Sequence, residues 1–504
     1  MRLLQTNNKR RPDGLINGED HTMVGIISHG AYIPRLRLTR SAIADAHGWL
    51  NPGLKGKAQG ARALANWDED SVTMAVEAAR DCLAGFDPSR VEALYAASTT
   101  FPFADRLNAS IMVSALSLGH DVRASDVTGS QRAGTTALMD ACMAVGSGAV
   151  RAALVGTSDS RRAKAASTQE MDFGDAGAAL LVGADNPIAA LRASHSLTLD
   201  FVDHFRGAGQ DFDYVWEERW IRDEGFAKLV PQAVGAVLDK AGVAADRVTH
   251  FILPCTLAKV PERIAKTCGI PGEAVRSTLA MECGEAGTSH AILMLSHALE
   301  EASPGDMILV AQFGQGCNAL LFEVTQAIRA LPKRRGVIGS IDAGRTETNY
   351  MKLLTFKDML AWDRGMRAEK DGKTALTVLY RKDDMITGLM GGKCRRCGTV
   401  QYPRQRICVN PNCGAVDSQD PYPFADKKAR ILSWSADFLT YSLDPPQHYG
   451  MVTFEEGGRL MTDFTDVDPG TVESGQEMRM VFRVKDFDEA RGFRRYFWKA
   501  APVT

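Results

Sequence analysis

Four cysteines in the C-terminal third of the chain have the residue type and spacing of a metal site. Cys394 and Cys397 form one pair, Cys408 and Cys413 form a second, and ten residues separate the pairs. Thiolates paired across a short hairpin suit tetrahedral zinc. Four thiolates fill the coordination sphere and leave no position for water, so we predict structural rather than catalytic zinc. A disulfide pair is the alternative, which a reducing compartment disfavours.

The composition is that of an ordinary globular protein of several domains. A length of 504 residues indicates about three domains at about 100–200 residues each. The net charge of −2 disfavours a broad nucleic-acid or anionic-membrane surface. No apolar run approaches the roughly 20 residues of a membrane-spanning helix. Ten cysteines are too sparse for a disulfide scaffold, which favours a reducing, cytoplasmic location.

An internal repeat defines the larger part of the chain. Each copy contains a helical pattern, a short apolar strand, a second helical pattern and a second apolar strand. In the first copy these segments are 75–85, 94–97, 135–147 and 152–156. In the second copy they are 233–242, 251–253, 290–302 and 307–310. Buried strands alternating with helices indicate an α/β fold, and the spacing of about 150 residues predicts two halves related by a pseudo-twofold axis.

The remaining segments differ in pattern from the repeat. Met23 opens the first apolar stretch, and the polar lead before it has no apolar core typical of a secretory signal, so we predict a disordered extension. Short alternating runs separated by Gly and Pro turns near the C-terminus predict a small all-β barrel. The predicted divisions are an extension (1–22), two α/β halves (23–190 and 191–330), a connector (331–385), a zinc ribbon (386–427) and a barrel (428–504).

Several stretches within residues 25–325 resemble the thiolase superfamily, most closely hydroxymethylglutaryl-CoA synthases and initiating-type ketoacyl synthases. The resemblance rests on motifs that follow one another in the family's order: 125–135 at the nucleophile turn, 153–159 at the following strand, Phe173-Gly174-Asp175-Ala176-Gly177, the mid-chain segment around 212–220, and the glycine loop 313–316. It implies a duplicated, five-layered α-β-α-β-α fold and an enzyme that acts on acyl-CoA thioesters. The family's pairing implies a homodimer or a higher homo-oligomer.

The C-terminal part, about 386–504, resembles the zinc ribbon and oligonucleotide-binding-type (OB) barrel that accompany thiolase-like acyl-CoA enzymes. The segment from Pro445-Pro446 to Arg459 carries this resemblance. It implies a zinc ribbon followed by a five-stranded barrel, fused here to the α/β region. A barrel of this type can also bind single-stranded nucleic acid. Because little aromatic–basic interleaving is present outside 491–497, we do not expect a nucleic-acid ligand.

The sequence departs from the family at the catalytic positions. The resemblance places Gln131 at the nucleophilic cysteine, Cys255 at the histidine and Glu285 at the asparagine, with Ser289 or His290 as the alternative to Glu285. Ser98-Thr99-Thr100 occupies the region of the synthases' acid–base glutamate. Gln131 cannot attack a thioester, but its amide can donate to a carbonyl or enolate oxygen.

The proton-transfer group and any displaced nucleophile have several candidates. Glu285 can act as a base if burial raises its pKa, and His290 is expected in the first turn of the following helix. Cys255 is a candidate nucleophile, which would need a cation or a helix N-terminus beside it. The structural alternatives are that Cys255 is a small buried hydrophobe, that Glu285 complements a helix N-terminus, and that His290 packs in the core.

These observations favour an enzyme that breaks or forms a C–C bond β to the thioester carbonyl. Retro-aldol or retro-Claisen cleavage in a catabolic pathway is the preferred hypothesis, with CoA as part of the substrate and no cysteine acyl-enzyme at the usual position. One alternative is a hydroxymethylglutaryl-CoA synthase- or ketoacyl synthase-like acyltransferase that uses Cys255. Another is a non-catalytic acyl-CoA-binding subunit. The acyl group stays open. Trp216 and Trp220 are compatible with a bulky or aromatic pocket and equally with a role in the core.

Overall fold

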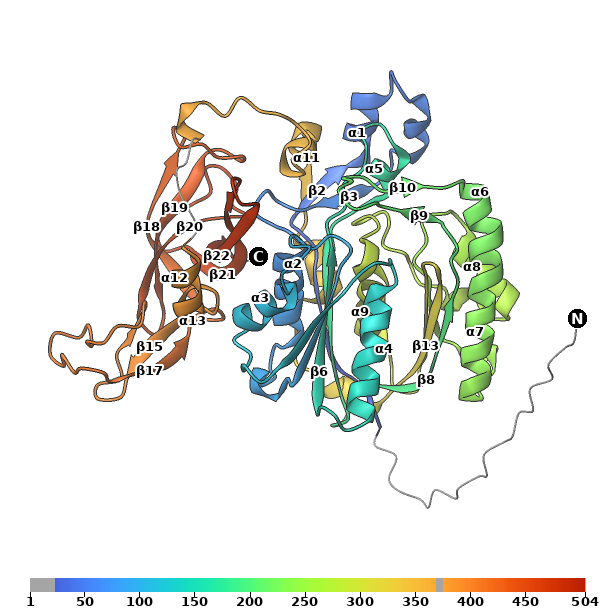
Figure 1. Cartoon of the computed structure of the whole chain (residues 1–504), viewed down its shortest axis with the longest axis horizontal. Coiled ribbons are helices and arrows are strands. Elements are labelled where there is room, and N and C mark those ends of the chain that lie inside the picture. Colours follow the sequence, from blue (N-terminus) through green and yellow to red (C-terminus); the bar gives the residue numbers. More distant parts are fainter. Residues whose placement is uncertain (1–22, 369–374, 504) are drawn as a thin grey trace, which may run out of the picture.

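The described residues form an α/β body and a smaller β-rich module side by side (Figure 1). The structure, a computed structural model, describes residues 23–368 and 375–503, and the predicted extension 1–22 lies outside them. Nine strands of the described body form one mixed sheet in the order β11-β12-β13-β8-β1-β7-β6-β4-β5. Its strands are β1 (Gly25–Tyr32), β4 (Ala93–Ala97), β5 (Arg123–Val127), β6 (Ala152–Asp159), β7 (Ala176–Gly183), β8 (Ala189–Thr198), β11 (His250–Ile252), β12 (Met307–Phe313) and β13 (Gly316–Val324).

The sheet bends between its two halves and encloses two helices, which produces five layers. β1 and β8 pair at only two positions, Gly25–Ala190 and Ile26–Ala189. Figure 1 shows the layers in succession: α2 and α3, the β6 half, α4 and α9, the β8–β13 half, then α7 and α8. The helices are α2 (Ser71–Cys82), α3 (Asn108–Ala115), α4 (Ala133–Gly146), α7 (Ala227–Ala241), α8 (Val260–Cys268) and α9 (His290–Glu301). The predicted duplicated α/β fold is therefore confirmed.

Local sequence explains where these elements begin and end. Asp70 caps α2 by accepting from the Thr73 amide while the Thr73 hydroxyl accepts from the Asp70 amide, a reciprocal capping box. α7 ends where Gly242 adopts a left-handed conformation with φ 64°, which glycine takes without a Cβ penalty. β7 is buried at all eight positions, as expected for an apolar strand covered by helices on both faces.

Smaller elements lie at the upper end of the body in Figure 1. They are β2 (Leu36–Thr39), α1 (Arg40–His47), β3 (Ala61–Leu64), α5 (Thr168–Asp172), β9 (His204–Phe205), β10 (Tyr214–Val215) and α6 (Glu218–Trp220). β9 and β10 form a two-stranded ribbon. These elements surround the end of the sheet at which the candidate site lies.

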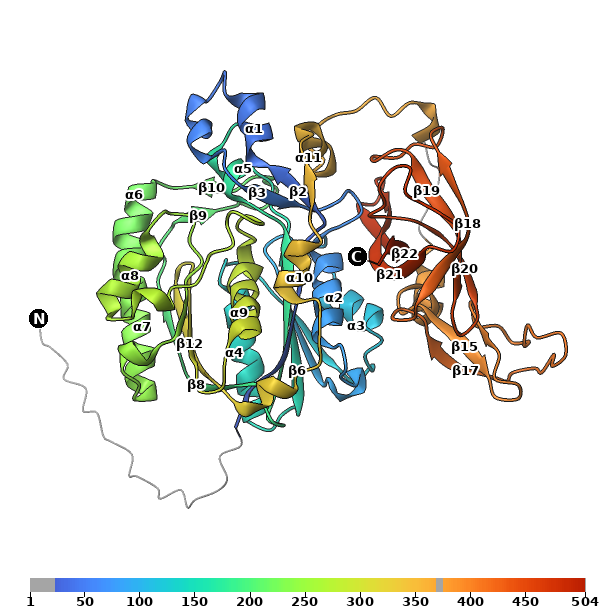
Figure 2. The ribbon, with the colours of Figure 1, turned by 180° about the vertical axis from the view of Figure 1, so that it is seen from behind.

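The segment predicted as an extended connector carries structure of its own. It contains α10 (Gly336–Asp342), β14 (Arg345–Glu347), α11 (Tyr350–Phe356), α12 (Leu376–Arg381) and α13 (Asp383–Ile386). β14 pairs with β2 in parallel, and Figure 2 shows α10 lying beside α9. Lys357 is buried, with its Nζ 2.6 Å from Asp175 Oδ1 and 2.7 Å from Ser160 Oγ. Elements of three to seven residues leave too little periodicity for a sequence pattern to reveal them.

The C-terminal module consists of a zinc ribbon and a five-stranded barrel. The ribbon strands are β15 (Met390–Cys394), β16 (Val400–Gln401) and β17 (Gln419–Pro423), and the barrel strands are β18 (Ala429–Asp437), β19 (Gln447–Phe454), β20 (Arg459–Asp463), β21 (Glu477–Asp488) and β22 (Phe493–Pro502). The barrel sheet has the order β20-β19-β18-β21-β22. A bridge between Phe464 and Ala500 joins its two edges. The predicted OB-type barrel is confirmed.

The module packs on α2 through apolar and charged contacts. Buried residues of the barrel and of α2 belong to one continuous apolar cluster. Glu77 of α2 accepts from the Phe482 amide at 2.9 Å, and the Arg80 guanidinium lies 4.8 Å from the Trp498 ring centre. Arg483 is fully buried, and its Nη2 lies 3.0 Å from both Glu69 Oε1 and Asp466 Oδ2.

We predict that Arg483→Met destabilises the protein strongly. Removing the guanidinium leaves Glu69 and Asp466 buried without their counter-charge, which costs about 3–5 kcal/mol. Urea unfolding measures the effect. The matched control is Arg430→Met, because Arg430 is exposed and pairs with Glu477 at 3.2 Å, an arrangement worth about 0–1 kcal/mol. Equal losses for the two variants would contradict the prediction.

Candidate functional site

Gln131 lies in the turn between β5 and α4, where two other segments converge on it. It immediately precedes Arg132, the N-cap residue of α4, so its side chain stands at the positive end of the helix dipole. A Cβ on Gly134 would come 2.4 Å from the Thr288 carbonyl oxygen, and a Cβ on Gly314 would come 3.6 Å from Gln131 Cβ. The absence of side chains at both glycines brings the loops 287–289 and 314–316 against this turn.

The main chain of Gln131 is held by a hydrogen bond, while its side-chain amide has no hydrogen-bond partner among the described residues. Gln312 Nε2 donates to the Gln131 carbonyl oxygen at 2.7 Å, and Gln312 Oε1 accepts from the Thr135 hydroxyl at 2.9 Å. Gln131 Oε1 is buried and has no hydrogen-bond partner among the described residues. No bond to Gln131 Nε2 is found in residues 23–368 and 375–503 either. A buried polar group without a partner indicates a site that a ligand completes.

Asp159, at the end of β6, joins the segments around Gln131. Its carboxylate accepts from the Ser98, Thr99 and Thr100 hydroxyls at 2.8–3.0 Å. It also accepts from the Thr288 amide at 2.8 Å. The three hydroxyl residues at the predicted position of the synthases' glutamate are therefore all engaged with one carboxylate. Asp159 lies about 60 positions from these hydroxyl residues, so no sequence spacing identifies it as their partner.

Glu285 is an ion-paired carboxylate beside this turn. Its Oε2 pairs with the buried Arg161 guanidinium, and its Oε1 accepts from the Gly287 amide at 2.8 Å. Burial alone would raise the pKa of Glu285, but the Arg161 guanidinium, by its charge and its hydrogen bond, and the Gly287 amide hold the pKa below its usual value. The condition for Glu285 to act as a base, a pKa raised by burial, is therefore not met. Arg161 also lies over the Phe173 ring, 3.7 Å from its centre. Because Arg161 is 124 positions from Glu285, the sequence alone does not reveal that the two side chains pair.

His290 begins α9 and uses both ring nitrogens within the fold. Nδ1 accepts from the Ala286 amide at 3.1 Å, and Nε2 is 2.7 Å from the Thr278 carbonyl oxygen. These partners fix the neutral tautomer with its proton on Nε2. Burial lowers the pKa of His290. His290 therefore holds the loop that carries Glu285 and has no free nitrogen for proton transfer.

Cys255 lines a separate cavity of about 390 Å³. Basic side chains of the same cavity are Arg40, Lys57 and Lys259. Lys259, the N-cap residue of α8, has a left-handed φ of 60°, a strained conformation for a lysine. Burial, followed by the negative charges of nearby glutamates, raises the pKa of Cys255 to about 12. The thiol is therefore protonated near neutral pH and is a poor nucleophile.

A histidine that sequence reasoning did not select lies on the same side of the body. His204 begins β9, and its Nδ1 is 2.8 Å from Asp203 Oδ2. Gln315 Nε2 donates to Asp203 Oδ1 at 2.6 Å, so the loop beside Gln131 also holds this carboxylate. An adjacent Asp–His pair has no distinctive spacing, and only the fold shows that the pair meets the glycine loop.

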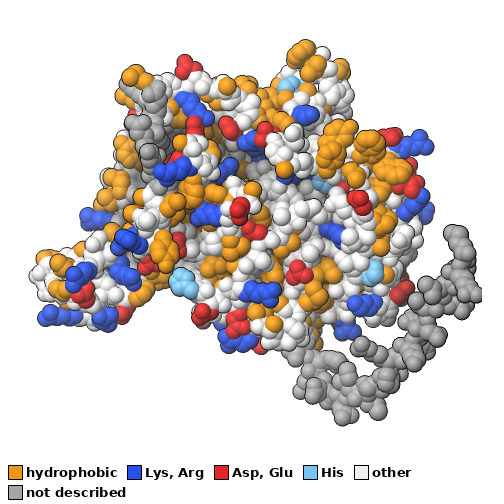
Figure 3. Space-filling view, in the orientation of Figure 1, with side chains coloured by type: hydrophobic (Ala, Val, Ile, Leu, Met, Phe, Trp, Pro, Cys, Tyr) orange, Lys and Arg blue, Asp and Glu red, His pale blue; other side chains and the backbone are white. Residues whose placement is uncertain are grey.

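Exposed aromatic side chains lie on the segment from β9 to α6, which begins at His204. Trp216 and Trp220 are 52% and 46% exposed, and Figure 3 shows hydrophobic side chains gathered over β9, β10 and α6 at the upper right. Trp220 stacks on Phe201 with ring centres 5.7 Å apart, and Phe201 meets Phe313 edge-on at 5.9 Å. A row of aromatic rings thus leads from the surface to the glycine loop.

The four predicted zinc ligands come together. The Sγ atoms of Cys394, Cys397, Cys408 and Cys413 lie within 4.8 Å of one another. Tetrahedral zinc with Zn–S bonds of about 2.3 Å places its sulfur ligands about 3.8 Å apart. The separations of 3.9 Å between Cys394 and Cys413 and 3.5 Å between Cys397 and Cys408 fit this geometry. No fifth His, Cys, Asp or Glu belongs to the cluster among the described residues.

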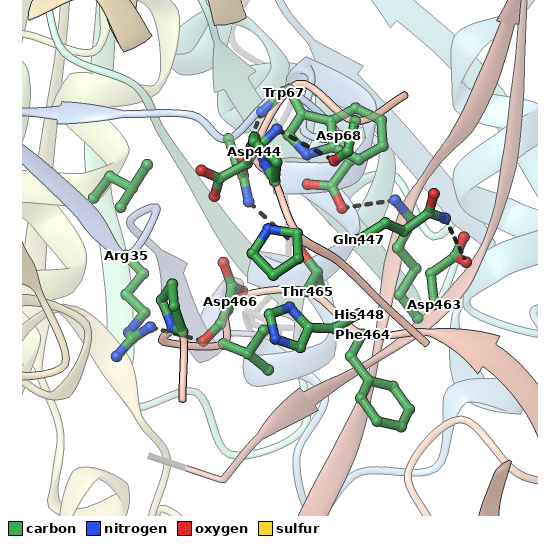
Figure 4. Close-up of a pocket in the computed structure, with 18 of the residues that line it drawn as sticks. Arg35, Trp67, Asp68, Asp444, Gln447, His448, Asp463, Phe464, Thr465 and Asp466 are labelled. Carbon is green, nitrogen blue, oxygen red and sulfur yellow. Dashed lines mark hydrogen bonds and ion pairs between the residues drawn. The ribbon is translucent and has the colours of Figure 1, made fainter. Parts of the chain in front are cut away.

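A further pocket, of about 80 Å³, lies between the barrel and the body (Figure 4). The labelled side chains come from both parts: Arg35 and Asp68 from the body, and Asp444, Gln447 and Asp463 from the barrel. Lys499 Nζ bonds Asp68 Oδ2 at 2.9 Å, and Arg35 bonds Asp468 at 2.6 Å. Because its charges are paired with one another, this pocket belongs to the packing of the two parts.

None of the helices in the described part of the chain has the length and apolar content that a bilayer-spanning helix requires.

Comparisons with known proteins agree with this architecture. Residues 238–323 match the family described as 3-oxoacyl-[acyl-carrier-protein] synthase III C terminal. Residues 388–417 match the rubredoxin-like zinc ribbon domain of ChsH2, and residues 423–483 match its C-terminal OB-fold domain. The structure of MvaS in complex with 3-hydroxy-3-methylglutaryl coenzyme A has a TM-score of 0.57 at 20% identity, covering 69% of this chain and 94% of that chain.

Curated relatives match more than half of the chain. The hydroxymethylglutaryl-CoA synthase of Pyrobaculum aerophilum is 30% identical over 313 residues, covering 60% of this chain and 89% of the relative. That of Caldivirga maquilingensis is 28% identical over 350 residues, covering 68% of this chain and 99% of the relative.

The layered fold and the turn before α4 define a chain of the thiolase superfamily. More specifically, its α/β body belongs to the hydroxymethylglutaryl-CoA synthase family, and a ChsH2-type zinc ribbon and OB fold are fused to it.

Proposed function

We propose that the protein is an acyl-CoA-processing enzyme that cleaves a C–C bond β to the thioester carbonyl without a cysteine acyl-enzyme. The observation that carries the proposal is Gln131, which occupies the turn before α4 with a fixed main chain and with a side-chain Nε2 donor that bonds nothing within residues 23–368 and 375–503. A donor at a helix N-terminus stabilises the negative oxygen of an enolate. Retro-aldol cleavage releases such an enolate and needs no nucleophile on the enzyme, which makes it the preferred form of the reaction.

The substrate's CoA part is assigned to the cavity beside Cys255. Arg40, Lys259 and the Asp172-paired Lys57 line this cavity of about 390 Å³. Cations together with the N-terminus of α8 suit phosphate groups. The aromatic row Trp220–Phe201–Phe313 supports a bulky apolar acyl part, because it ends at the loop beside Gln131.

The four-cysteine cluster suits a structural zinc ion. A homodimer or higher homo-oligomer and a reducing, cytoplasmic location are part of the same proposal. Within the described residues β5 is an edge strand, to which a second copy could add.

One observation favours a second candidate, an acyltransferase that uses Cys255. The thiol lines the cavity assigned to CoA, so a displaced nucleophile would lie close to a bound thioester. Its raised pKa of about 12 weighs against this function, because only the thiolate attacks a thioester efficiently. A third candidate is an acyl-CoA-binding subunit without activity of its own.

Intact-protein mass spectrometry with a panel of acyl-CoA esters tests these candidates, with released products measured in parallel. We expect turnover by the purified protein, no acyl adduct on any cysteine, and unchanged turnover for Cys255→Ala, because a protonated thiol takes no part in enolate chemistry. A stable adduct that disappears in Cys255→Ala would replace the proposal by acyl transfer. Lack of turnover with the whole panel, with binding retained, would favour the binding subunit.

A further inference from the structure

His204 has the arrangement of a histidine prepared for proton transfer. Its Nδ1 bonds the Asp203 carboxylate at 2.8 Å, and Asp203 is itself buried and held by Gln315 at 2.6 Å. A carboxylate on one nitrogen orients the ring and makes the other nitrogen more basic. His204 Nε2 makes no hydrogen bond within residues 23–368 and 375–503, and it is not among the buried unpartnered atoms. The reactive nitrogen is therefore accessible.

Contacts of the residues on both sides of His204 tie its segment to the loops beside the Gln131 turn. On one side, Gln315 follows Gly314, whose carbonyl oxygen accepts from the Ser130 hydroxyl at 3.2 Å. On the other side, Arg206 donates to the Thr99 carbonyl oxygen and pairs with Asp213 at 2.7 Å. His204 thus lies between a segment tied to the glycine loop and a segment tied to the end of β4.

We propose that His204, oriented by Asp203, is the catalytic base that takes the β-hydroxyl proton of an acyl-CoA substrate in the Gln131 site. This inference rests on the proposed C–C cleavage and names its proton-transfer group. Neither Glu285 nor His290 is free to act as this base. Glu285 is paired with Arg161, and both ring nitrogens of His290 are hydrogen-bonded within the fold.

The step balances without a co-reactant. Nε2 of His204 removes the hydroxyl proton, the oxygen forms a C=O bond to the β-carbon, and the bond between the α- and β-carbons breaks. Its electron pair forms the thioester enolate, whose oxygen accepts from the Gln131 amide. The protonated His204 then returns its proton to the α-carbon. The products are a ketone or aldehyde and the shortened acyl-CoA.

Charges around His204 determine the direction of its pH dependence. Burial lowers the pKa of His204, but the hydrogen bond and charge of Asp203 raise it, so the net pKa lies above its ordinary value; Arg161 lowers it and Asp213 raises it. The neutral ring is the base. Cleavage is therefore expected to fall as pH decreases through this raised pKa.

Two reactions of the zinc-loaded full-length protein test the inference. One is cleavage of 3-hydroxyacyl-CoA esters, with 3-hydroxy-3-methylglutaryl-CoA among them. The other is exchange of the α-hydrogens of propionyl-CoA with deuterated water. We expect His204→Gln to lower both rates by about 10²–10⁴-fold with the Kd for acyl-CoA unchanged. Asp203→Asn should move the acidic limb of the rate profile to lower pH.

The control is His297→Gln, because His297 is also a partly buried histidine near a carboxylate, 3.9 Å from Glu301 on α9. It should keep both rates and the wild-type pH profile. Wild-type rates and an unmoved pH profile in both folded variants, His204→Gln and Asp203→Asn, would overturn the role of His204 alone. Absence of cleavage and exchange in the wild-type protein would overturn the proposed function together with this inference.

Discussion

Gln131→Ala is expected to lower the rate of C–C cleavage by about 10²–10³-fold, the usual cost of removing one oxyanion-stabilising donor. The side-chain amide stands at the N-terminus of α4, and Gln312 holds the main-chain carbonyl oxygen of Gln131. The truncation therefore removes the donor without releasing the turn. Steady-state kinetics with the cleaved ester measure kcat, and calorimetry measures the Kd for the acyl-CoA. The loss should fall on kcat because enolate charge develops only in the transition state.

Two further variants sharpen this test. Gln131→Glu has nearly the same volume but replaces the donor by an acceptor, so it should be at least as inactive as Gln131→Ala. Gln326→Ala removes an exposed glutamine and should behave as the wild type. If Gln131→Ala turned over normally while still binding substrate, Gln131 would not stabilise the oxyanion.

Loss of one zinc ligand is the second change with a large expected effect. Cys408→Ser should abolish zinc binding, which contributes about 10–16 kcal/mol in isolated zinc-finger peptides. Cys408 is buried beside Cys397, and the same region carries Phe424, which packs with Phe454 of the barrel at 4.6 Å. Without metal, the ribbon should unfold and become sensitive to protease.

Metal analysis and limited proteolysis measure this effect. The wild type should contain about one zinc per chain, and new cleavage sites in the variant should fall within 386–427. Cys268→Ser is the control, because this half-buried cysteine lies outside the cluster. Full zinc content and wild-type protease resistance in Cys408→Ser would contradict a four-cysteine structural site.

Sequence patterns predicted the features that repeat or that have a fixed spacing. The repeat between 75–156 and 233–310 corresponds to buried strands and helices of the observed body, because long apolar periods survive any tertiary context. The four cysteines come together as predicted. Their spacing, two close pairs separated by a short segment, is typical of zinc sites and can be recognised in the sequence.

Other features depend on tertiary contacts that the sequence does not encode locally. Arg161 reverses the pKa shift expected for Glu285, yet 124 positions separate the two residues. Main-chain partners occupy His290, and Gln315 reaches Asp203 across 112 positions. Only the folded chain shows these pairings, so nothing in the sequence alone selects His204.

The first half of the connector is held against the α/β body by a buried lysine and by strand pairing. Because Lys357 is fixed to Asp175 and Ser160, and β14 is paired with β2, the first half of the connector has no freedom to act as a flexible tether. Linking two partners by a chain makes their association intramolecular and raises their effective concentration. Here the orientation of the ribbon and barrel is set by their packing on α2, while the first half of the linker is fixed to the body. Fusion therefore fixes the stoichiometry at one barrel per α/β body and removes the dilution-dependent dissociation to which a separate subunit would be subject.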